Sequence, residues 1–235
     1  MCRFSSGESP FTWEVSLPDR SRVRIGASHP KGSVSYKRNG AGWEHKAIPA
    51  EVCRILKRRV RDDELTVLSE QELEQAIESA TNQGARNILL RLIARRDYSR
   101  KEACDKLITY GFDYSTAKRA VDDLADIHAI DDLRYADVFI RSKIASGWGM
   151  ARIERELGNK GVDIHEVEGW PYDYLDPEDE VQRALEVAAR KRVSGPQAWQ
   201  KLVRFIAGRG FGLDVAKRAA SLALESRREE MERAY

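Results

Sequence analysis

The sequence has no apolar run that approaches the roughly 20 residues needed to span a bilayer. Its first ten residues also lack the apolar stretch of a secretory signal peptide. Cysteine is scarce: Cys2, Cys53 and Cys104 lie far apart and form no C-x-x-C pair, so we expect reduced thiols and no disulfide framework. These absences together predict a cytoplasmic protein that makes no contact with a membrane.

Motifs for catalysis and cofactor binding are missing too. The chain has no P-loop and no G-x-S-x-G, and Gly147-Trp148-Gly149 lacks the third glycine and the preceding strand of a dinucleotide-binding motif. The paired acids at 122–123 and 131–132 are better explained as helix-end and capping residues than as metal ligands. No metal-type spacing relates the four histidines to one another or to a cysteine: His29, His45, His128 and His165. We therefore expect no enzymatic activity, no metal and no cofactor.

Net charge is also nearly absent, because 40 Lys and Arg are balanced by 38 Asp and Glu, which leaves +2. The charges are nevertheless segregated along the chain. Residues 1–61 carry 13 basic and 5 acidic side chains, residues 162–182 carry no basic and 8 acidic ones, and residues 183–218 carry 9 basic and 2 acidic ones. This pattern fits a basic stripe for an acidic partner, and it fits ordinary solvated helix faces equally well.

Residues 1–49 have the two-residue period of β-strands, and Asn39-Gly40 is typical of a hairpin turn. They predict a small antiparallel β region with most of its basic side chains in solvent. The expected strands cover 12–17, 22–25, 32–37 and, more weakly, 43–48.

The period becomes helical after Pro49. Residues 50–84 predict a helical connector, in which an amphipathic helix over 51–61 precedes a helix that Ser69 caps.

The rest of the chain contains an internal repeat. Residues 111–120 (GFDYSTAKRA) and 210–219 (GFGLDVAKRA) share six of ten residues at an offset of 99, and a middle copy lies near half that offset. We predict a mainly α fold of three tandem three-helix repeats, stacked as an elongated, curved array. The first repeat covers 85–130, the second 131–168 and the third 178–235, with an acidic and aromatic linker over 169–177 (GWPYDYLDP) between the last two.

Several residues have structural roles in this scheme. Ser99 and Glu102 form a capping box at the start of the first repeat's second helix. Gly111 and Gly161 end the second helices of the first two repeats in a left-handed conformation. Three residues at the start of the second repeat, Asp131, Asp132 and Tyr135, are expected to cap and pack its first helix, although contact with a partner remains the alternative.

Basic residues recur at corresponding places in the repeats, where they could follow a chain of phosphates or an acidic protein surface. The third repeat carries them at 190–192, 201, 204 and 209. The candidate partner- or DNA-binding residues lie in the first two repeats: Arg95, Arg96, Arg100, Lys101, Arg141, Lys143, Arg152, Arg155 and Lys160.

These motifs are similar to those of a known family. The stretch 85–163 resembles the RecX regulatory proteins, which modulate the bacterial recombinase RecA, and 43–69 resembles the N-terminal extension of the longer members. The 169–177 linker departs from the continuous third helix of that family. The resemblance rests on Tyr98-Ser99-Arg100-Lys101-Glu102 with Leu107 and Gly111, Ile130-Asp131-Asp132-Leu133-Arg134-Tyr135-Ala136, Gly147-Trp148-Gly149, and Glu156-Leu157 with Lys160-Gly161-Val162.

The resemblance implies a non-enzymatic regulator that docks in the groove of the RecA–single-stranded DNA filament. It implies inhibition of ATP hydrolysis, strand exchange and the co-protease action on the SOS repressor. We expect a monomer that binds single-stranded DNA only weakly on its own, with the first two repeats along the groove. The alternative is a helical-repeat protein that binds nucleic acid directly, without a recombinase.

Overall fold

The computed structural model describes residues 2–4, 11–18, 31–38 and 42–233. The chain forms two compact units, Met1–Asp131 and Asp132–Tyr235. Helices dominate both units, and a small antiparallel sheet belongs to the first, so the predicted mainly α fold with a small β region is confirmed. No helix in the described ranges is long and apolar enough to cross a membrane.

The sheet has the order β1-β2-β3-β4, with antiparallel neighbours. Trp13 pairs with Tyr36 and Val15 with Val34, so the apolar residues of the central strands share one face. The expected strands at 12–17, 32–37 and 43–48 are present, whereas the one at 22–25 and the Asn39-Gly40 turn lie outside the described residues. The strands are β1 (Cys2–Phe4), which the sequence did not suggest, β2 (Phe11–Ser16), β3 (Gly32–Arg38) and β4 (Glu44–Ile48).

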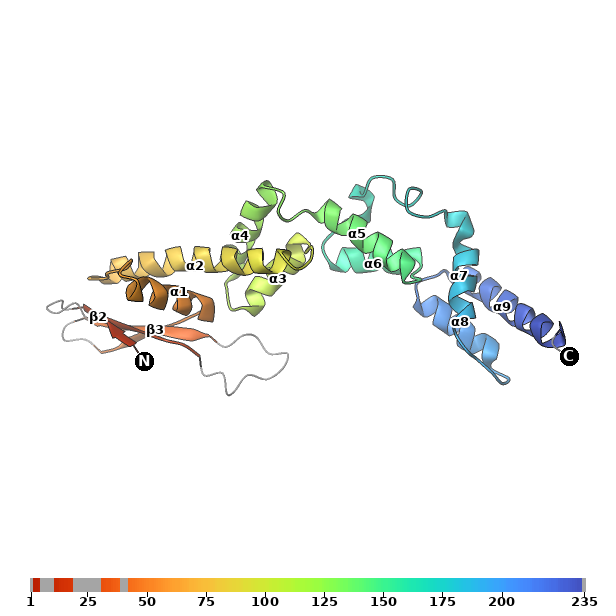
Figure 1. Cartoon of the computed structure of the whole chain (residues 1–235), viewed down its shortest axis with the longest axis horizontal. Coiled ribbons are helices and arrows are strands. Elements are labelled where there is room, and N and C mark those ends of the chain that lie inside the picture. Colours follow the sequence, from red (N-terminus) through yellow and green to blue (C-terminus); the bar gives the residue numbers. More distant parts are fainter. Residues whose placement is uncertain (1, 5–10, 19–30, 39–41, 234–235) are drawn as a thin grey trace. The chain divides into compact units, whose positions relative to one another are not determined.

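Helix α1 (Ala50–Arg61) contacts β2 and β3 on one side and α2 on the other (Figure 1). Its buried side chains, Val52, Cys53, Ile55 and Leu56, recur with helical spacing and join the core of the first unit. A Cβ on Gly32 would overlap the Cys53 sulfur atom, so glycine is needed where β3 passes under this helix. The sheet and α1 therefore share one hydrophobic core with the helices that follow.

Helix α2 (Glu70–Ile93) begins at the predicted cap, where the Ser69 hydroxyl accepts a hydrogen bond of 3.2 Å from the Glu72 amide. The predicted boundary between connector and first repeat, at 84–85, falls inside this continuous helix. Glycine inside a helix costs only about 1 kcal/mol relative to alanine, which is too little to end a helix packed along its length. Gly84 is buried, and a Cβ at this position would lie 3.4 Å from the Ile55 side chain and 3.5 Å from the Phe112 ring, so the helix packs closely here without being interrupted.

Two helices complete the first repeat, α3 (Arg100–Thr109) and α4 (Tyr114–Asp126). Gly111 has φ +94° and ends α3 in the predicted left-handed conformation. Gly161 (φ +78°) and Gly210 (φ +93°) do the same in the other repeats, and a buried apolar residue follows each of these glycines. This shared helix ending is the local structure behind the repeat in the sequence.

The second repeat contains α5 (Asp132–Ala145) and α6 (Met150–Asn159), followed by the 3₁₀ turn η2 (Ile164–Glu166) in place of a third long helix. Gly169, at φ +75°, and the proline after Trp170 end any helical continuation. The predicted linker packs against this repeat: Leu175 is buried, and Trp170 and Tyr174 border the core formed by α5 and α6.

The third repeat follows the 3₁₀ turn η3 (Pro177–Asp179). Just before this turn, the Asp176 carboxylate accepts a hydrogen bond of 2.8 Å from the Glu178 amide. Its helices are α7 (Glu180–Ala189), α8 (Ala198–Gly208) and α9 (Leu213–Arg233). Small alanines of α7 and α9 pack against larger residues of α8, such as Leu202 and Ile206, so that these helices form a core of their own.

Candidate functional site

The first group of candidate contact residues surrounds the turn between α2 and α3. Ser99, fully buried, accepts a hydrogen bond of 3.1 Å from the Glu102 amide, as the predicted capping box requires. The Arg96 guanidinium lies 3.7 Å from the centre of the Tyr98 ring and donates to the Glu102 carboxylate at 3.0 Å. Arg96 thus contributes to the shape of this turn.

The other three members of this group extend into solvent: Arg95, Arg100 and Lys101. Arg100 and Lys101 form the first turn of α3, and the buried Ser99 and Tyr98 fix the backbone from which they project. This turn therefore presents positive charge from a rigid part of the first unit. Its contact with a partner remains a prediction.

The second group is arranged around Trp148, between α5 and α6. The Arg152 guanidinium lies 3.8 Å from the indole centre, and the Lys143 ammonium lies 5.0 Å from it and 5.0 Å from the Phe139 ring. Both cations are half-buried. Two of the predicted contact residues therefore help to hold the aromatic cluster of the second repeat in place.

Arg152 also belongs to the joint between the second and third repeats. It donates to the Gly208 carbonyl at 3.2 Å, and Arg209 of the third repeat donates to the Ser146 carbonyl at 3.0 Å. The Gly149 amide donates to the Arg209 carbonyl at 2.9 Å, and Arg183 donates to the Trp148 carbonyl at 2.7 Å. Burial lowers the pKa of Arg183. Arginines and backbone groups thus connect the two repeats directly.

The remaining candidates of the second repeat lie nearer to solvent. Arg141 is exposed, donates to Asp137 at 3.0 Å and lies 4.9 Å from the Tyr174 ring. Arg155 is exposed, with its guanidinium 3.7 Å from Glu156, and Lys160 is half-buried at the end of α6. Ion pairs in solvent contribute little and exchange readily, so Arg141 and Arg155 stay available to an external anion.

The predicted packing residues of the second repeat lie where a structural role requires them. Tyr135 is 7 % exposed and stacks on Phe139 at 5.9 Å within the core of the repeat. Asp131 precedes α5 and Asp132 is its first residue. At these positions a negative charge stabilises the helix, because it lies at the positive end of the helix dipole.

No group of three or more metal-ligating side chains occurs within the described ranges. Burial raises the pKa of the Cys53 thiol to about 11 and also raises that of Cys104, so both are less reactive than an ordinary thiol. These ranges therefore supply no metal cluster, and neither Cys53 nor Cys104 is an activated thiol.

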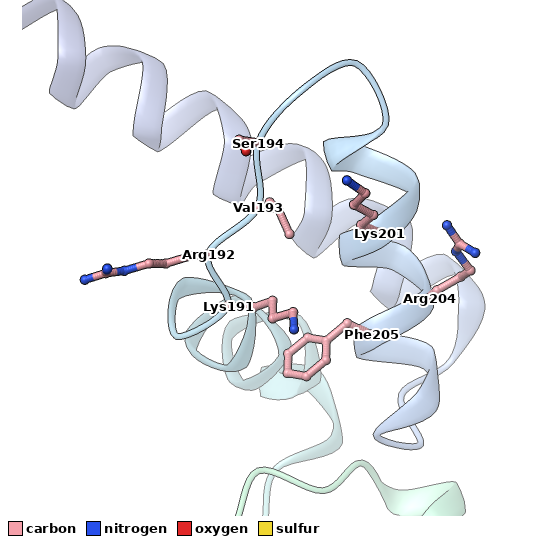
Figure 2. Close-up of a pocket in the computed structure, with 7 residues that line it drawn as sticks. All are labelled: Lys191, Arg192, Val193, Ser194, Lys201, Arg204 and Phe205. Carbon is pink, nitrogen blue, oxygen red and sulfur yellow. The ribbon is translucent and has the colours of Figure 1, made fainter.

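A basic hollow of about 670 Å³ in the third repeat is the feature that sequence reasoning did not assemble (Figure 2). The excess of basic residues over 183–218 was its signal, but the sequence could not show that the loop after α7 faces one side of α8. The basic residues around the hollow are Lys191, Arg192, Lys201 and Arg204, and its apolar members are Val193 and Phe205.

Comparison with known proteins identifies two domains. Residues 85–124 match the family model described as "RecX, first three-helix domain", and residues 131–168 match "RecX, second three-helix domain". Both matches fall within the first and second repeats.

The chain is also similar to whole proteins named "Regulatory protein RecX". The protein of Acidithiobacillus ferrooxidans is 34% identical over 129 residues, which is 53% of this chain and 80% of that protein. The protein of Chromohalobacter salexigens is 35% identical over 146 residues, 61% of this chain and 95% of that protein. A crystal structure of regulatory protein RecX shares the fold, with a TM-score of 0.52 and 15% identity over 86% of this chain and 94% of that one. The chain therefore belongs to the RecX family of regulatory proteins.

Proposed function

We propose that this chain is a non-enzymatic, cytoplasmic and monomeric regulator that binds the RecA–single-stranded DNA filament in its groove. It inhibits ATP hydrolysis, strand exchange and co-protease activity, and so modulates recombination and the SOS response. The observation that carries this proposal is the match to both RecX domains together with 34% and 35% identity over 80% and 95% of two proteins named regulatory protein RecX.

The contact residues that we propose in the first unit are the three exposed ones at the turn before α3 and at its first turn: Arg95, Arg100 and Lys101. Those that we propose in the second unit are Arg141 and Arg155. The same basic regions include four further candidates, Arg96, Lys143, Arg152 and Lys160. Of these, Arg96 and Arg152 make intramolecular hydrogen bonds with which a partner would have to compete. Exposed positive charge near a DNA–protein filament favours both fast association and phosphate contact.

Charge reversal tests this surface. The triple variant Arg95→Glu/Arg100→Glu/Lys101→Glu should bind RecA filaments assembled on single-stranded DNA about tenfold or more weakly than the wild type, because attraction becomes repulsion. Acidic residues suit the first turn of a helix, so α3 should remain folded. Immobilised filaments and biolayer interferometry measure the affinity.

The matched control is Arg54→Glu/Arg58→Glu/Arg61→Glu, which makes the same change of charge at exposed positions of α1 in the same unit. We expect it to retain most of the affinity. Undiminished filament binding by the first triple variant, or an equal loss in both, would refute the assignment of this surface.

A second function, direct binding of nucleic acid without a recombinase, is favoured by the basic hollow of the third repeat. This alternative predicts tight binding to bare DNA, with a steep dependence on salt, and no effect on RecA.

A further inference from the structure

The hollow of the third repeat is formed by the loop after α7 and by one side of α8. In Figure 2, Lys191 and Phe205 point toward one another and Lys201 extends from α8 toward the loop, while Arg192 and Arg204 lie at opposite edges. All four cations are exposed, and Phe205 is half-buried. The loop and the helix therefore present a concave, positively charged surface.

The cations of this surface have no acidic partner in the part of the chain that the structure describes. Among the described residues, no carboxylate forms an ion pair with Lys191, Arg192, Lys201 or Arg204, and no acidic side chain lines the hollow. Like charges in one concavity raise the local potential and attract an anion from solution.

Two contacts hold the basic loop in position. Arg227 of α9 donates to the carbonyl groups of Ala188 and Lys191, each at 2.9 Å, and so fixes the backbone where α7 ends. The Phe205 ring has the Lys191 ammonium 5.3 Å from its centre and the Arg209 guanidinium 5.2 Å from it. These intramolecular contacts therefore hold the positively charged loop in place without a bound ligand.

The chemistry of the lining selects the kind of ligand. The four charged side chains are donors only, which suits the acceptor oxygens of a phosphate group, and Ser194 adds a hydroxyl to the lining. Two of the cations are lysines, which bind phosphate as point charges. The Lys191 and Arg209 cations already lie beside the Phe205 ring, so the face of this ring is not left open to an apolar side chain of a protein partner.

We infer that the basic hollow of the third repeat binds the phosphate backbone of a single nucleic-acid strand. This inference deepens the proposed function, because it gives the regulator a DNA contact in the third repeat, separate from the surface proposed for the first two. Binding to bare DNA in the absence of any recombinase tests this inference separately from the proposed filament function.

The test uses the full chain and a fluorescein-labelled oligothymidylate, with binding followed by fluorescence anisotropy over a series of salt concentrations. Lys191→Gln/Lys201→Gln should weaken binding about tenfold at low salt. The slope of log affinity against log salt should become shallower by about 1.4, since each phosphate contact on a single strand contributes about 0.7.

The matched control is Arg228→Gln/Arg233→Gln, which removes the same net charge from exposed positions of α9 in the same repeat. It should leave the salt slope unchanged. Unchanged circular dichroism of both variants shows that neither effect arises from unfolding.

Three results would overturn the inference: no salt-dependent binding of the oligonucleotide by the wild type, wild-type binding by the lysine variant, or an equal loss in both variants. If the lysine variant binds bare DNA normally but no longer binds the RecA filament, the inference is also overturned, and the ligand of the hollow is an acidic protein surface.

If the lysine variant loses DNA binding and the wild-type protein has no effect on RecA, the DNA site in the hollow is supported and the proposed filament function is refuted.

Discussion

Arg227 shows how one half-buried guanidinium can hold in place the loop that forms a proposed binding surface. It is half-buried and donates to carbonyl groups at the end of α7, where helix geometry leaves carbonyls without intrahelical donors. Replacing it with methionine keeps the apolar stem but removes every donor. Because a hydrogen bond to a charged group contributes about 1.5–3 kcal/mol, we expect Arg227→Met to lower the free energy of unfolding by about 2 kcal/mol.

Urea unfolding followed by circular dichroism measures this loss, with Arg228→Met as the neighbouring exposed control. The control should change stability by less than about 0.5 kcal/mol. Equal stability of the two variants would contradict the structural role given to Arg227.

At this scale the sequence predicted local roles better than distant ones. The Ser99 cap and the left-handed conformations of Gly111 and Gly161 were predicted because each depends on a few neighbouring residues. The engagement of Arg152 with Gly208 was not, because it joins residues 56 positions apart and requires the packing of two repeats. A basic residue in a sequence looks the same whether it meets solvent or a backbone carbonyl.

The joint between the second and third repeats depends on elements that approach each other closely. A Cβ on Gly149, before α6, would overlap the Gly210 carbonyl group, and a Cβ on Gly210 would overlap Arg152. Backbone cannot shift as easily as a flexible side chain. We therefore expect Gly149→Ala to destabilise the second unit by about 1–3 kcal/mol, the usual cost of overpacking.

Gly158 provides a control of opposite sign. It lies inside α6, and nothing lies within 4 Å of the Cβ that alanine would add. Gly158→Ala should therefore stabilise the protein by up to about 1 kcal/mol through helix propensity. Thermal unfolding measures the stability of both variants. If Gly149→Ala leaves the stability unchanged, the two repeats separate more easily than the structure indicates.

Whole elements were predicted where the hydrophobic period was long. Helix α1 and the central strands follow it closely. The continuity of α2 through Gly84 was missed, because tertiary packing compensates for a residue of weak helix propensity. The packing of Trp170 and Tyr174 against α5 and α6 was missed for a similar reason: an acidic and aromatic segment with Gly and Pro has no periodicity that indicates its partner.

The whole molecule combines a first repeat that packs with the sheet and a joined pair of repeats in the second unit. The charged turn before α3 and the basic hollow beside α8 are the surfaces through which we propose that it contacts a filament of protein and DNA. Family membership supports the regulatory role, and the contact residues named for it are proposals.

The most direct measurement follows ATP hydrolysis by the cognate RecA on single-stranded DNA while the purified chain is added. We predict inhibition at concentrations below that of RecA, together with only weak, salt-sensitive binding to the same DNA in the absence of RecA. Undiminished ATP hydrolysis at RecA-saturating concentrations, accompanied by tight binding to bare DNA, would contradict it and would indicate a nucleic-acid-binding protein that acts without a recombinase.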